Sequence, residues 1–285
     1  MDRKITFQAK PLHLIGRNVI EGSYAPDFKV SDADLNEINL QGLGDTVKII
    51  NSFPSLDTPV CDMQVKEFNK QAMSLSSDVI IAGVSMDLPF AQKRFCESNT
   101  IKNIKVFSDY RSASFGINYG LLIRELNLLA RAVIIIDKQR IVRYMQIVRQ
   151  LERFPDYADV LKGLDEVLLH PVAASTQGAV SGCKPCEAAS GLLDKTTLQA
   201  MVLQNKGWQL VDDKKLRKEF KFKDFSFVKF FVDILSAIAE EQGHHPSISM
   251  QYNKVIVTLT THAAGGLTEN DFILSRIIDE IILEE

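Results

Sequence analysis

Hydrophobic positions in the first 170 residues follow the strand period and the helix period in turn. Short apolar runs rich in β-branched residues are typical of buried strands. Four such strands are expected, at residues 47–53, 79–84, 132–136 and 141–147. Helical spacing occurs after three of them, with Val65, Phe68, Ala72 and Leu75 on one face and further helices at about 87–96 and 155–169. Strands that alternate with helices predict an α/β layered sheet.

The order of elements changes in the last hundred residues. Helices are expected at residues 194–205, 227–241 and 268–283, and strands at 216–225, 247–251 and 254–260. The strand at 216–225 alternates charged and apolar residues, which indicates one buried and one exposed face. Strands grouped in this way predict an antiparallel sheet with helices packed on one face, the α+β arrangement.

A segment without hydrophobic period separates these two patterns. Residues 171–182 read PVAASTQGAVSG, which is the composition of a linker. The chain has 285 residues, about twice the ~150 residues of a typical domain. We therefore expect a domain over residues 1–170, a linker over 171–182 and a second domain over 183–285.

Composition and charge narrow the class of protein. Hydrophobic residues make up 46% and charged residues 24%, which is ordinary for a globular chain. Residues 1–170 carry 21 charges of each sign and the remainder 12 basic against 15 acidic, so no basic surface for nucleic acid is expected. No run approaches the roughly 18 apolar residues of a membrane span. The start of the chain lacks the apolar stretch of a signal peptide, and the four cysteines are too few for a disulfide scaffold. We therefore expect a cytoplasmic protein with reduced thiols.

Cys61 lies between the first buried strand and its helix, in the stretch PSLDTPVC at 54–61. Amide N–H groups and the positive dipole end of a first helical turn stabilise a thiolate. Thr58, three residues earlier, can place its hydroxyl beside the sulfur. A thiolate surrounded by donors suits attack on a peroxide O–O bond. The alternative is a buried structural cysteine, which is the commonest role of an isolated one.

Three of the five histidines cluster late in the chain, His244 and His245 before Pro246 and then His262, with Asp271 nine residues further on. If the strand at 254–260 folds back beside the end of the preceding helix, the three rings line one pocket. Histidine donates and accepts protons near neutral pH, so such a pocket suits general acid–base chemistry. Zinc ligation and ordinary polar histidines at a helix end are the alternatives, although no spacing here is a recognised zinc motif.

The stretch FPSLDTPVC at 53–61 resembles the peroxiredoxin active site, and the chain from Thr6 to about Leu168 is similar throughout to the bacterial thiol peroxidase family. DLPFAQKRFC at 87–96 and LLARAVIIID at 128–137 carry the same resemblance. The resemblance implies a thioredoxin-like fold. It also implies reduction of hydrogen peroxide and organic hydroperoxides, with thioredoxin as the electron donor.

Roles follow from the resemblance, position by position. It implies that Cys61 is the peroxidatic cysteine, which passes through a sulfenic acid, and that Cys96 is the resolving cysteine, which closes an intramolecular disulfide with it. Thr58 and Arg131 correspond to the hydroxyl and guanidinium partners of thiolate and peroxide, and Pro54 to a shielding proline. Nothing local brings positions 61 and 96 together, so a bond between them requires both helix ends to loosen.

The histidine cluster belongs to a longer pattern, Glu240-x3-His244-His245-Pro246-x5-Tyr252-x9-His262-x8-Asp271. It resembles the signature of the pterin-4a-carbinolamine dehydratase family, and the similarity runs from about Cys183 to Ile282. The resemblance implies loss of water from 4a-hydroxytetrahydropterin to give the quinonoid dihydropterin, without metal or redox cofactor. His244, His245 and His262 would carry the protons, and Asp271 would orient or support them. Some members carry an aromatic residue where Ser247-Ile248 stand, so pterin stacking from that position is not implied.

Cys183 and Cys186 form a Cys-x-x-Cys pair beside the linker. The spacing is that of a redox dithiol or of half a zinc site, and zinc would need two further ligands. Similar pairs occur near the start of many bacterial members of the dehydratase family, so inheritance is the favoured interpretation. The other hypothesis is that the linker, with a reach of roughly 20 Å, lets this pair reduce the Cys61–Cys96 disulfide.

The predicted function is a bifunctional enzyme, a thiol peroxidase followed by a pterin-4a-carbinolamine dehydratase. Its partners would be thioredoxin, small hydroperoxides and pterins, but neither nucleic acid nor membrane, and we expect a homo-oligomer. Pterin oxidation releases peroxide, so one hypothesis is that the fusion removes peroxide near its source. The alternative is a peroxide sensor fused to a non-catalytic module that serves oligomerisation or partner binding.

Overall fold

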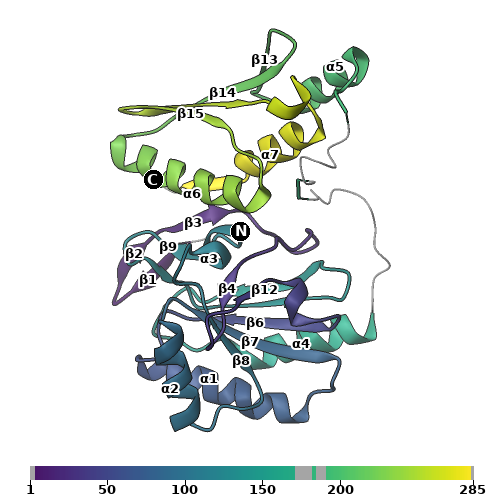
Figure 1. Cartoon of the computed structure of the whole chain (residues 1–285). Coiled ribbons are helices and arrows are strands. Elements are labelled where there is room, and N and C mark those ends of the chain that lie inside the picture. The colour runs from purple at the N-terminus through teal and green to yellow at the C-terminus, as the bar shows by residue number, and fades with distance from the viewer. Residues whose placement is uncertain (1–3, 171–181, 184–190, 284–285) are drawn as a thin grey trace. The chain divides into compact units, whose positions relative to one another are not determined.

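The computed structural model describes residues 4–170, 182–183 and 191–283 of the chain (Figure 1). The chain divides into two compact units, with the division between residues 179 and 180. The predicted linker over 171–182 lies outside the described residues apart from Gly182, and each unit is considered by itself below. Within the described part, no helix is both long and apolar enough to pass through a membrane.

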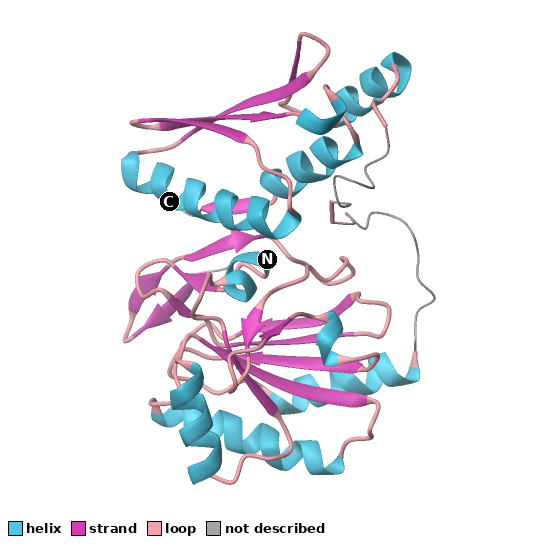
Figure 2. Cartoon of the chain, in the orientation of Figure 1, coloured by secondary structure: helices cyan, strands magenta, loops and turns pink. Residues whose placement is uncertain are grey.

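The N-terminal unit is built on a seven-stranded sheet in the order β12-β11-β6-β7-β8-β4-β5. Its strands are β4 (Val30–Ser31), β5 (Glu37–Ile38), β6 (Val47–Ser52), β7 (Val79–Ser85), β8 (Lys105–Ser108), β11 (Ala132–Ile136) and β12 (Val142–Ile147). Strands β6, β7 and β8 run parallel, whereas β11 is antiparallel to both β6 and β12. Helices follow strands in the chain, as the alternating pattern predicts (Figure 2), and the α/β prediction for this unit is confirmed.

The helices of this unit are α1 (Pro59–Gln71), α2 (Pro89–Ser98), α3 (Ser114–Asn118) and α4 (Tyr157–Leu169). Helices α1 and α4 share one apolar core with the central strands, in which Val65 and Phe68 of α1 meet Val160 and Leu164 of α4. Every residue of β6 and β11 is buried, because helices or loops cover both faces of a central strand. The end of β6 therefore gives the loop before Cys61 a rigid base.

Several short elements of the N-terminal unit have no counterpart in the sequence prediction. They are β1 (Ile5–Phe7), β2 (Lys10–Leu12), β3 (Leu14–Arg17), β9 (Leu122–Ile123) and β10 (Leu128–Leu129), strands β4, β5 and β8, helix α3, and the 3-10 turns at Gln41–Leu43 and Ala72–Ser74. None exceeds five residues, so none is long enough to show a period. Tertiary pairing forms them, as when β9 pairs with β3 and β10.

The C-terminal unit contains a four-stranded antiparallel sheet in the order β13-β14-β16-β15. The strands are β13 (Gln209–Val211), β14 (Lys215–Lys221), β15 (Ser247–Gln251) and β16 (Lys254–Leu259), and the helices are α5 (Lys195–Gln204), α6 (Phe225–Gln242) and α7 (Glu269–Asp279). Helices α6 and α7 lie against one face of the sheet (Figure 1). Val255, Val257 and Leu259 of β16 are fully buried on that face. The predicted α+β arrangement is confirmed.

Two predicted elements of this unit were wrong at their ends. The strand expected over 216–225 stops at Lys221, and Phe225 is already the first residue of α6. Asp224 ends the strand, because its side chain accepts hydrogen bonds from the amides of Ser226 and Phe227 and so caps the helix. The closing helix expected over 268–283 stops at Asp279, and Ile281–Leu283 form the short strand β17, in keeping with the preference of β-branched residues for strands.

Candidate functional site

The first site forms where β6 ends and α1 begins. Thr58 is the N-cap of α1, with extended backbone angles, and Pro59 fills the first helical position. The Thr58 hydroxyl oxygen accepts a hydrogen bond from the Cys61 amide at 3.4 Å, which satisfies one of the amides left free at a helix start. Cys61 thus lies in the first turn of α1, as predicted.

The Cys61 sulfur is fully buried and has two donors beside it. The Thr58 hydroxyl lies 2.8 Å from Sγ, and Nη2 of Arg131 lies 3.4 Å from it. Thr58 and Arg131 are far apart in the sequence, Thr58 in the loop after β6 and Arg131 directly before β11. Hydrogen bonds and a positive charge favour the thiolate over the thiol.

Arg131 is itself held in place by neutral groups. Its Nε and Nη2 donate to the Leu151 carbonyl at 3.2 and 2.9 Å, and Nη1 donates to the side-chain oxygen of Gln64. The Gln64 amide in turn donates to Asn51. Among the described residues, the hydrogen-bond partners of Arg131 are thus carbonyl oxygens and the Cys61 sulfur, none of them a carboxylate. The buried guanidinium therefore brings its positive charge to the Cys61 sulfur without a carboxylate among its hydrogen-bond partners.

Asp87 ties the loop before Cys61 to the end of β7. Its carboxylate accepts hydrogen bonds from the Ser55 hydroxyl at 2.7 Å, the Leu56 amide at 2.8 Å and the Ser85 hydroxyl at 2.7 Å. Pro54, directly before this anchored segment, is buried. The loop therefore has a defined shape on one side of the sulfur.

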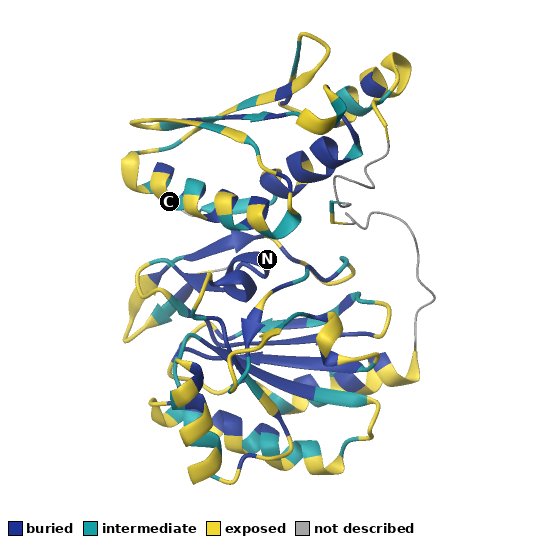
Figure 3. Ribbon diagram, in the orientation of Figure 1, coloured by how far each residue is buried: buried dark blue, intermediate teal, exposed yellow. Residues whose placement is uncertain are grey.

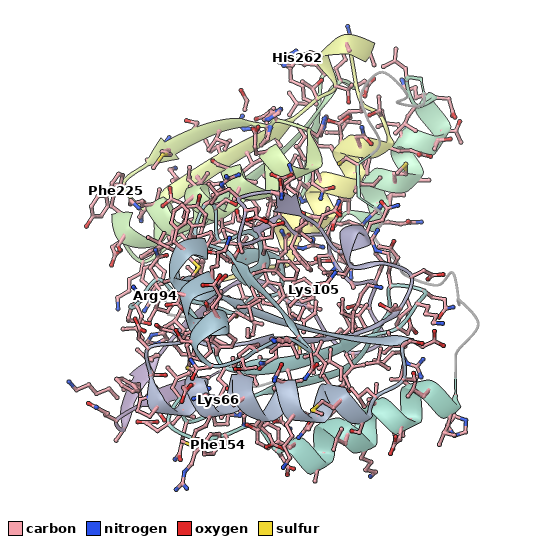
Figure 4. The ribbon with its side chains drawn as sticks, turned by 60° about the horizontal axis from the view of Figure 1, so that its bottom comes forward. Lys66, Arg94, Lys105, Phe154, Phe225 and His262 are labelled. Carbon is pink, nitrogen blue, oxygen red and sulfur yellow. The ribbon has the colours of Figure 1, made fainter. Side chains whose placement is uncertain are left out.

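Cys96 lies near the end of α2 and is half-buried. It borders a hollow of about 300 Å³ together with Lys93, Glu97 and Ile104. Burial raises the pKa of the Cys96 thiol, and the negative charge of Glu97 raises it further. Cys61 and Cys96 are both free thiols in this structure. Figure 4 locates helices α1 and α2 through Lys66 and Arg94.

The second site lies at the C-terminal end of α6. Gly243 ends the helix in the left-handed conformation, with φ at 59°, and the His244 amide donates to the Ala239 carbonyl at 3.1 Å. This turn directs the His244 ring inward, where its Nε2 lies 2.8 Å from Oδ1 of Asp271. His244 is 4% exposed and Asp271 is completely buried.

Asp271 uses its second oxygen to start helix α7. Oδ2 accepts hydrogen bonds from the Thr268 amide and from the Thr261 hydroxyl, both at 2.8 Å. Thr268 and Asp271 together form the capping box of α7. The carboxylate therefore joins the end of α6, the end of β16 and the start of α7, and its position relative to His244 is set by three elements.

The other two histidines of the cluster are exposed to solvent. The Nε2 of His245 is 2.9 Å from Oε2 of Glu240, and both side chains are mostly exposed. His262 is also exposed, at the start of the 3-10 turn His262–Ala264 (Figure 4). Ser247 pairs with Thr258, so the chain segments that carry His245 and His262 leave the sheet at the same end. The expectation that three rings line one pocket needs correction, since the fold buries His244 and exposes the other two.

The described residues contain no group of three His, Cys, Asp or Glu side chains arranged to hold a metal ion. Cys183 is described and Cys186 is not. The Cys183 amide donates to the side-chain oxygen of Gln242 at 2.8 Å, and its thiol lies 3.6 Å from the Asn270 carbonyl oxygen. Cys183 is therefore attached to the C-terminal unit, between the end of α6 and the start of α7.

Known proteins resemble the N-terminal half of the chain. Thiol peroxidase of Staphylococcus haemolyticus (strain JCSC1435) is 44% identical over 159 residues, which is 56% of this chain and 96% of that protein. Thiol peroxidase of Staphylococcus aureus (strain MRSA252) is 46% identical over 154 residues, 54% of this chain and 93% of that protein. The chain belongs to the thiol peroxidase family.

Solved structures agree with this thiol peroxidase assignment. A peroxiredoxin-like protein from Aquifex aeolicus is 42% identical, with a TM-score of 0.55, and the match covers 59% of this chain and 98% of that one. Thiol peroxidase from Chromobacterium violaceum, 21% identical with a TM-score of 0.54 over 59% of this chain and 99% of that one, shares the fold. The family model described as Redoxin matches residues 20–161. The thioredoxin-like fold predicted for the N-terminal domain is confirmed.

The C-terminal unit matches a different protein family. Residues 191–281 match the family model described as pterin 4 alpha carbinolamine dehydratase. The chain is thus a fusion of a thiol peroxidase with a pterin-4a-carbinolamine dehydratase domain, and the bifunctional prediction is confirmed at this level.

Sequence reasoning named the residues that contact the thiol peroxidase sulfur but missed those that support them. Gln64 and Asp87 are the clearest cases. Gln64 is a polar residue three positions after Cys61, on the face of α1 that also buries Val65 and Phe68, and a buried polar residue on an apolar face signals a hydrogen-bond network. The supporting roles of Thr261 and Thr268 were likewise missed, although Thr261 directly precedes His262 and Thr268 lies between His262 and Asp271.

Proposed function

We propose that Cys61 is the nucleophile of the peroxidase reaction. Its thiolate attacks the terminal oxygen of a hydroperoxide, the S–O bond forms as the O–O bond breaks, and the departing oxygen takes a proton to leave as water or alcohol. Cys61 becomes a sulfenic acid. Arg131 and Thr58 stabilise the thiolate and the developing charge on the peroxide oxygens, and Pro54 shields the sulfur from water.

Cys96 completes the cycle in this proposal. Its thiolate attacks the sulfenic sulfur of Cys61, water leaves, and an intramolecular disulfide forms, which thioredoxin then reduces by thiol–disulfide exchange. Cys96 is half-buried on α2 and Cys61 is buried on α1, so both helix ends must loosen for the bond to form. The raised pKa of the Cys96 thiol keeps it protonated until that movement exposes it.

The second activity is assigned to the end of the C-terminal unit that carries His244, His245 and His262. The C4a–O bond of a 4a-hydroxytetrahydropterin breaks, one group protonates the departing hydroxyl, and another removes the proton from the neighbouring ring N–H. Asp271 orients the buried His244 ring through its 2.8 Å contact with Nε2, while His245 and His262 are accessible to the substrate. Support comes from the dehydratase family match and from the buried histidine–carboxylate pair.

The observation that carries the peroxidase proposal is the Cys61 sulfur between the Thr58 hydroxyl and the Arg131 guanidinium. Its test is disulfide mapping by peptide mass spectrometry, after one equivalent of hydrogen peroxide is added to the fully reduced chain. We expect a Cys61–Cys96 bridge. Overoxidised Cys61 without any bridge, or a bridge that involves Cys183 or Cys186, would contradict the assigned role of Cys96.

The dehydratase proposal has a separate test. The decay of a 4a-hydroxytetrahydropterin is followed by ultraviolet absorption, with and without the chain. We expect the chain to accelerate the decay and His262→Ala to remove most of the acceleration. The matched control is His13→Ala, which removes a histidine of the other unit that contacts Glu125. Equal decay with the native chain and with buffer would show that the dehydratase fold here is not catalytic.

A further inference from the structure

Gln92 is a buried polar residue of α2, the helix that carries Cys96. In α2, all of which the structure describes, only Pro89 and Gln92 are buried (Figure 3). The Gln92 amide nitrogen Nε2 donates to the Ser85 hydroxyl at 3.0 Å and to the Phe107 carbonyl at 2.8 Å. Ser85 ends β7 and Phe107 lies near the end of β8. Gln92 therefore anchors α2 to two strands of the sheet.

Ser85 connects this anchor to the loop before α1. Its hydroxyl donates to Oδ2 of Asp87 at 2.7 Å, and Oδ1 of Asp87 accepts from the Ser55 hydroxyl, also at 2.7 Å. The Ser55 carbonyl in turn accepts a hydrogen bond from the Thr58 amide at 3.1 Å. These bonds form an unbroken series, the Gln92–Thr58 series, which joins α2 to the N-cap of α1.

The anchor at Gln92 is not a fully satisfied one. The side-chain oxygen Oε1 of Gln92 is buried and has no hydrogen-bond partner among the described residues, and an unsatisfied buried acceptor costs free energy. After Gln92, every residue of α2 is exposed or half-buried. Gln92 and Cys96, about one helical turn apart, both border the hollow of about 300 Å³ beside α2. The two bonds that the Gln92 amide donates therefore contribute directly to the stability of the closed helix.

We propose that Gln92 is a positioning residue that sets how long the sulfenic acid of Cys61 persists. The inference rests on the proposed roles of Cys61 and Cys96. Peroxide attack on Cys61 needs the loop shape that the Gln92–Thr58 series maintains. Disulfide formation needs Cys96 to move, and an opening that spreads over the turn before Cys96 breaks the bonds of Gln92. The two steps therefore depend on the anchor in opposite ways.

Two reactions compete for the sulfenic acid once it has formed. In one, the Cys96 thiol attacks the Cys61 sulfur, an S–S bond forms, and the hydroxyl leaves as water. In the other, a second hydroperoxide reacts with the same sulfur. Its O–O bond breaks, one oxygen is added to give a sulfinic acid, and the other leaves as water or alcohol. This oxidation uses the closed geometry, with Thr58 and Arg131 beside the sulfur, so the Gln92 anchor favours it over the disulfide.

The test follows both products after the reduced full chain is mixed with hydrogen peroxide. Samples are quenched in acid at successive times, and peptide mass spectrometry measures the Cys61–Cys96 disulfide and the Cys61 sulfinic acid. Gln92→Met removes both donated hydrogen bonds at similar side-chain volume. We expect disulfide formation to become roughly fivefold faster, the factor that one neutral hydrogen bond contributes to an equilibrium. The peroxide concentration that overoxidises half of the chain should rise by the same factor, because the two reactions share one intermediate.

Two further variants locate the effect. Ser85→Ala breaks the Gln92–Thr58 series beyond Gln92. It should also speed disulfide formation, and it should slow peroxide attack, because Asp87 loses a donor. Gln71→Met is the matched control at the end of α1, where the Gln71 amide donates to Glu67 at 3.1 Å. This control should leave both reactions unchanged.

The outcomes separate this inference from the proposed function. A native chain that forms no Cys61–Cys96 disulfide would refute the assigned role of Cys96, and the inference with it. A native chain that forms the disulfide at a rate that Gln92→Met leaves unchanged or lowers would overturn the inference alone. Equal acceleration in Gln92→Met and Gln71→Met would assign the effect to general loosening of the fold, which also overturns it.

Discussion

Thr58 is a single residue with two tasks, because its hydroxyl caps α1 and also lies 2.8 Å from the Cys61 sulfur. The two tasks can be separated by substitution. Loss of an N-cap costs about 1 kcal/mol of stability, whereas loss of a donor aimed at a reacting group costs roughly 100-fold in rate. Chemistry should therefore respond far more strongly than folding.

We predict that Thr58→Val slows oxidation of Cys61 by hydrogen peroxide roughly 100-fold, measured by stopped-flow fluorescence as a second-order rate constant. Thr58→Ser, which keeps the hydroxyl, should retain most of the rate. Thr46→Val is the matched control, because the Thr46 hydroxyl is buried without a hydrogen-bond partner among the described residues. A Thr58→Val rate close to that of Thr46→Val would refute a role for the hydroxyl.

Asp271 divides its two oxygens in a similar way, one for His244 and one for the helix cap and Thr261. We predict that Asp271→Asn lowers the dehydration rate by about tenfold or more, because an amide carries no charge and accepts hydrogen bonds at only one of the two positions that hold His244 and the start of α7. Thr268→Ala is the control, since it removes the capping hydroxyl and leaves the His244–Asp271 pair. Peroxidase turnover in the same chain serves as an internal reference. Equal losses in the two variants would reduce Asp271 to a helix cap.

At the scale of elements, α2 has to change shape during the proposed cycle. Cys96 is the eighth residue of this ten-residue helix, and the helix backbone must open for its sulfur to reach Cys61. Short helices gain most of their stability from tertiary packing. The buried residues of α2 are Pro89 and Gln92, both in its first half. The second half is therefore the part expected to open first.

We predict that one equivalent of peroxide increases amide hydrogen exchange in the second half of α2, while β6, β7 and β11 stay protected. Hydrogen exchange with mass spectrometry on the full chain measures this directly. The Cys96→Ser variant, which cannot form the disulfide, should keep α2 protected at the same peroxide dose. Unchanged exchange across α2 in a chain that carries the Cys61–Cys96 bond would show that another segment moves instead.

At the scale of the whole molecule, the question is whether the two halves exchange electrons. Cys183 contacts Gln242 and Asn270 of the C-terminal unit, which favours an inherited feature of the dehydratase half over a mobile reductant. We predict that Cys183→Ser/Cys186→Ser leaves peroxide turnover with thioredoxin unchanged within about twofold, a difference of about 0.4 kcal/mol. Turnover is followed by NADPH oxidation with thioredoxin and its reductase. A marked loss, together with a trapped disulfide between the two halves, would make the chain an internal relay.

Much of this architecture can be predicted from sequence, because its main elements have strong local signals. Strands 132–136 and 247–251 were predicted to the residue, since apolar or alternating runs are bounded by turn residues. The end of β14 at Lys221 was not predicted, because the alternating apolar pattern continues to Phe225. The cap formed by Asp224 nevertheless starts helix α6 there. Elements of two to five residues escaped prediction, because only their partners stabilise them.

The residues of the candidate sites also divide into those that the sequence places and those that only the tertiary structure places. The sequence alone determined that Cys61 lies in the first turn of a helix with Thr58 beside its sulfur. Residues three positions apart in one helical turn are neighbours whatever surrounds the helix. Only the tertiary structure decided that Gln64 and the Leu151 carbonyl hold Arg131, and that Asp271 pairs with His244 rather than His262. Those contacts join residues from 20 to 67 positions apart, and long-range packing sets which of them meet.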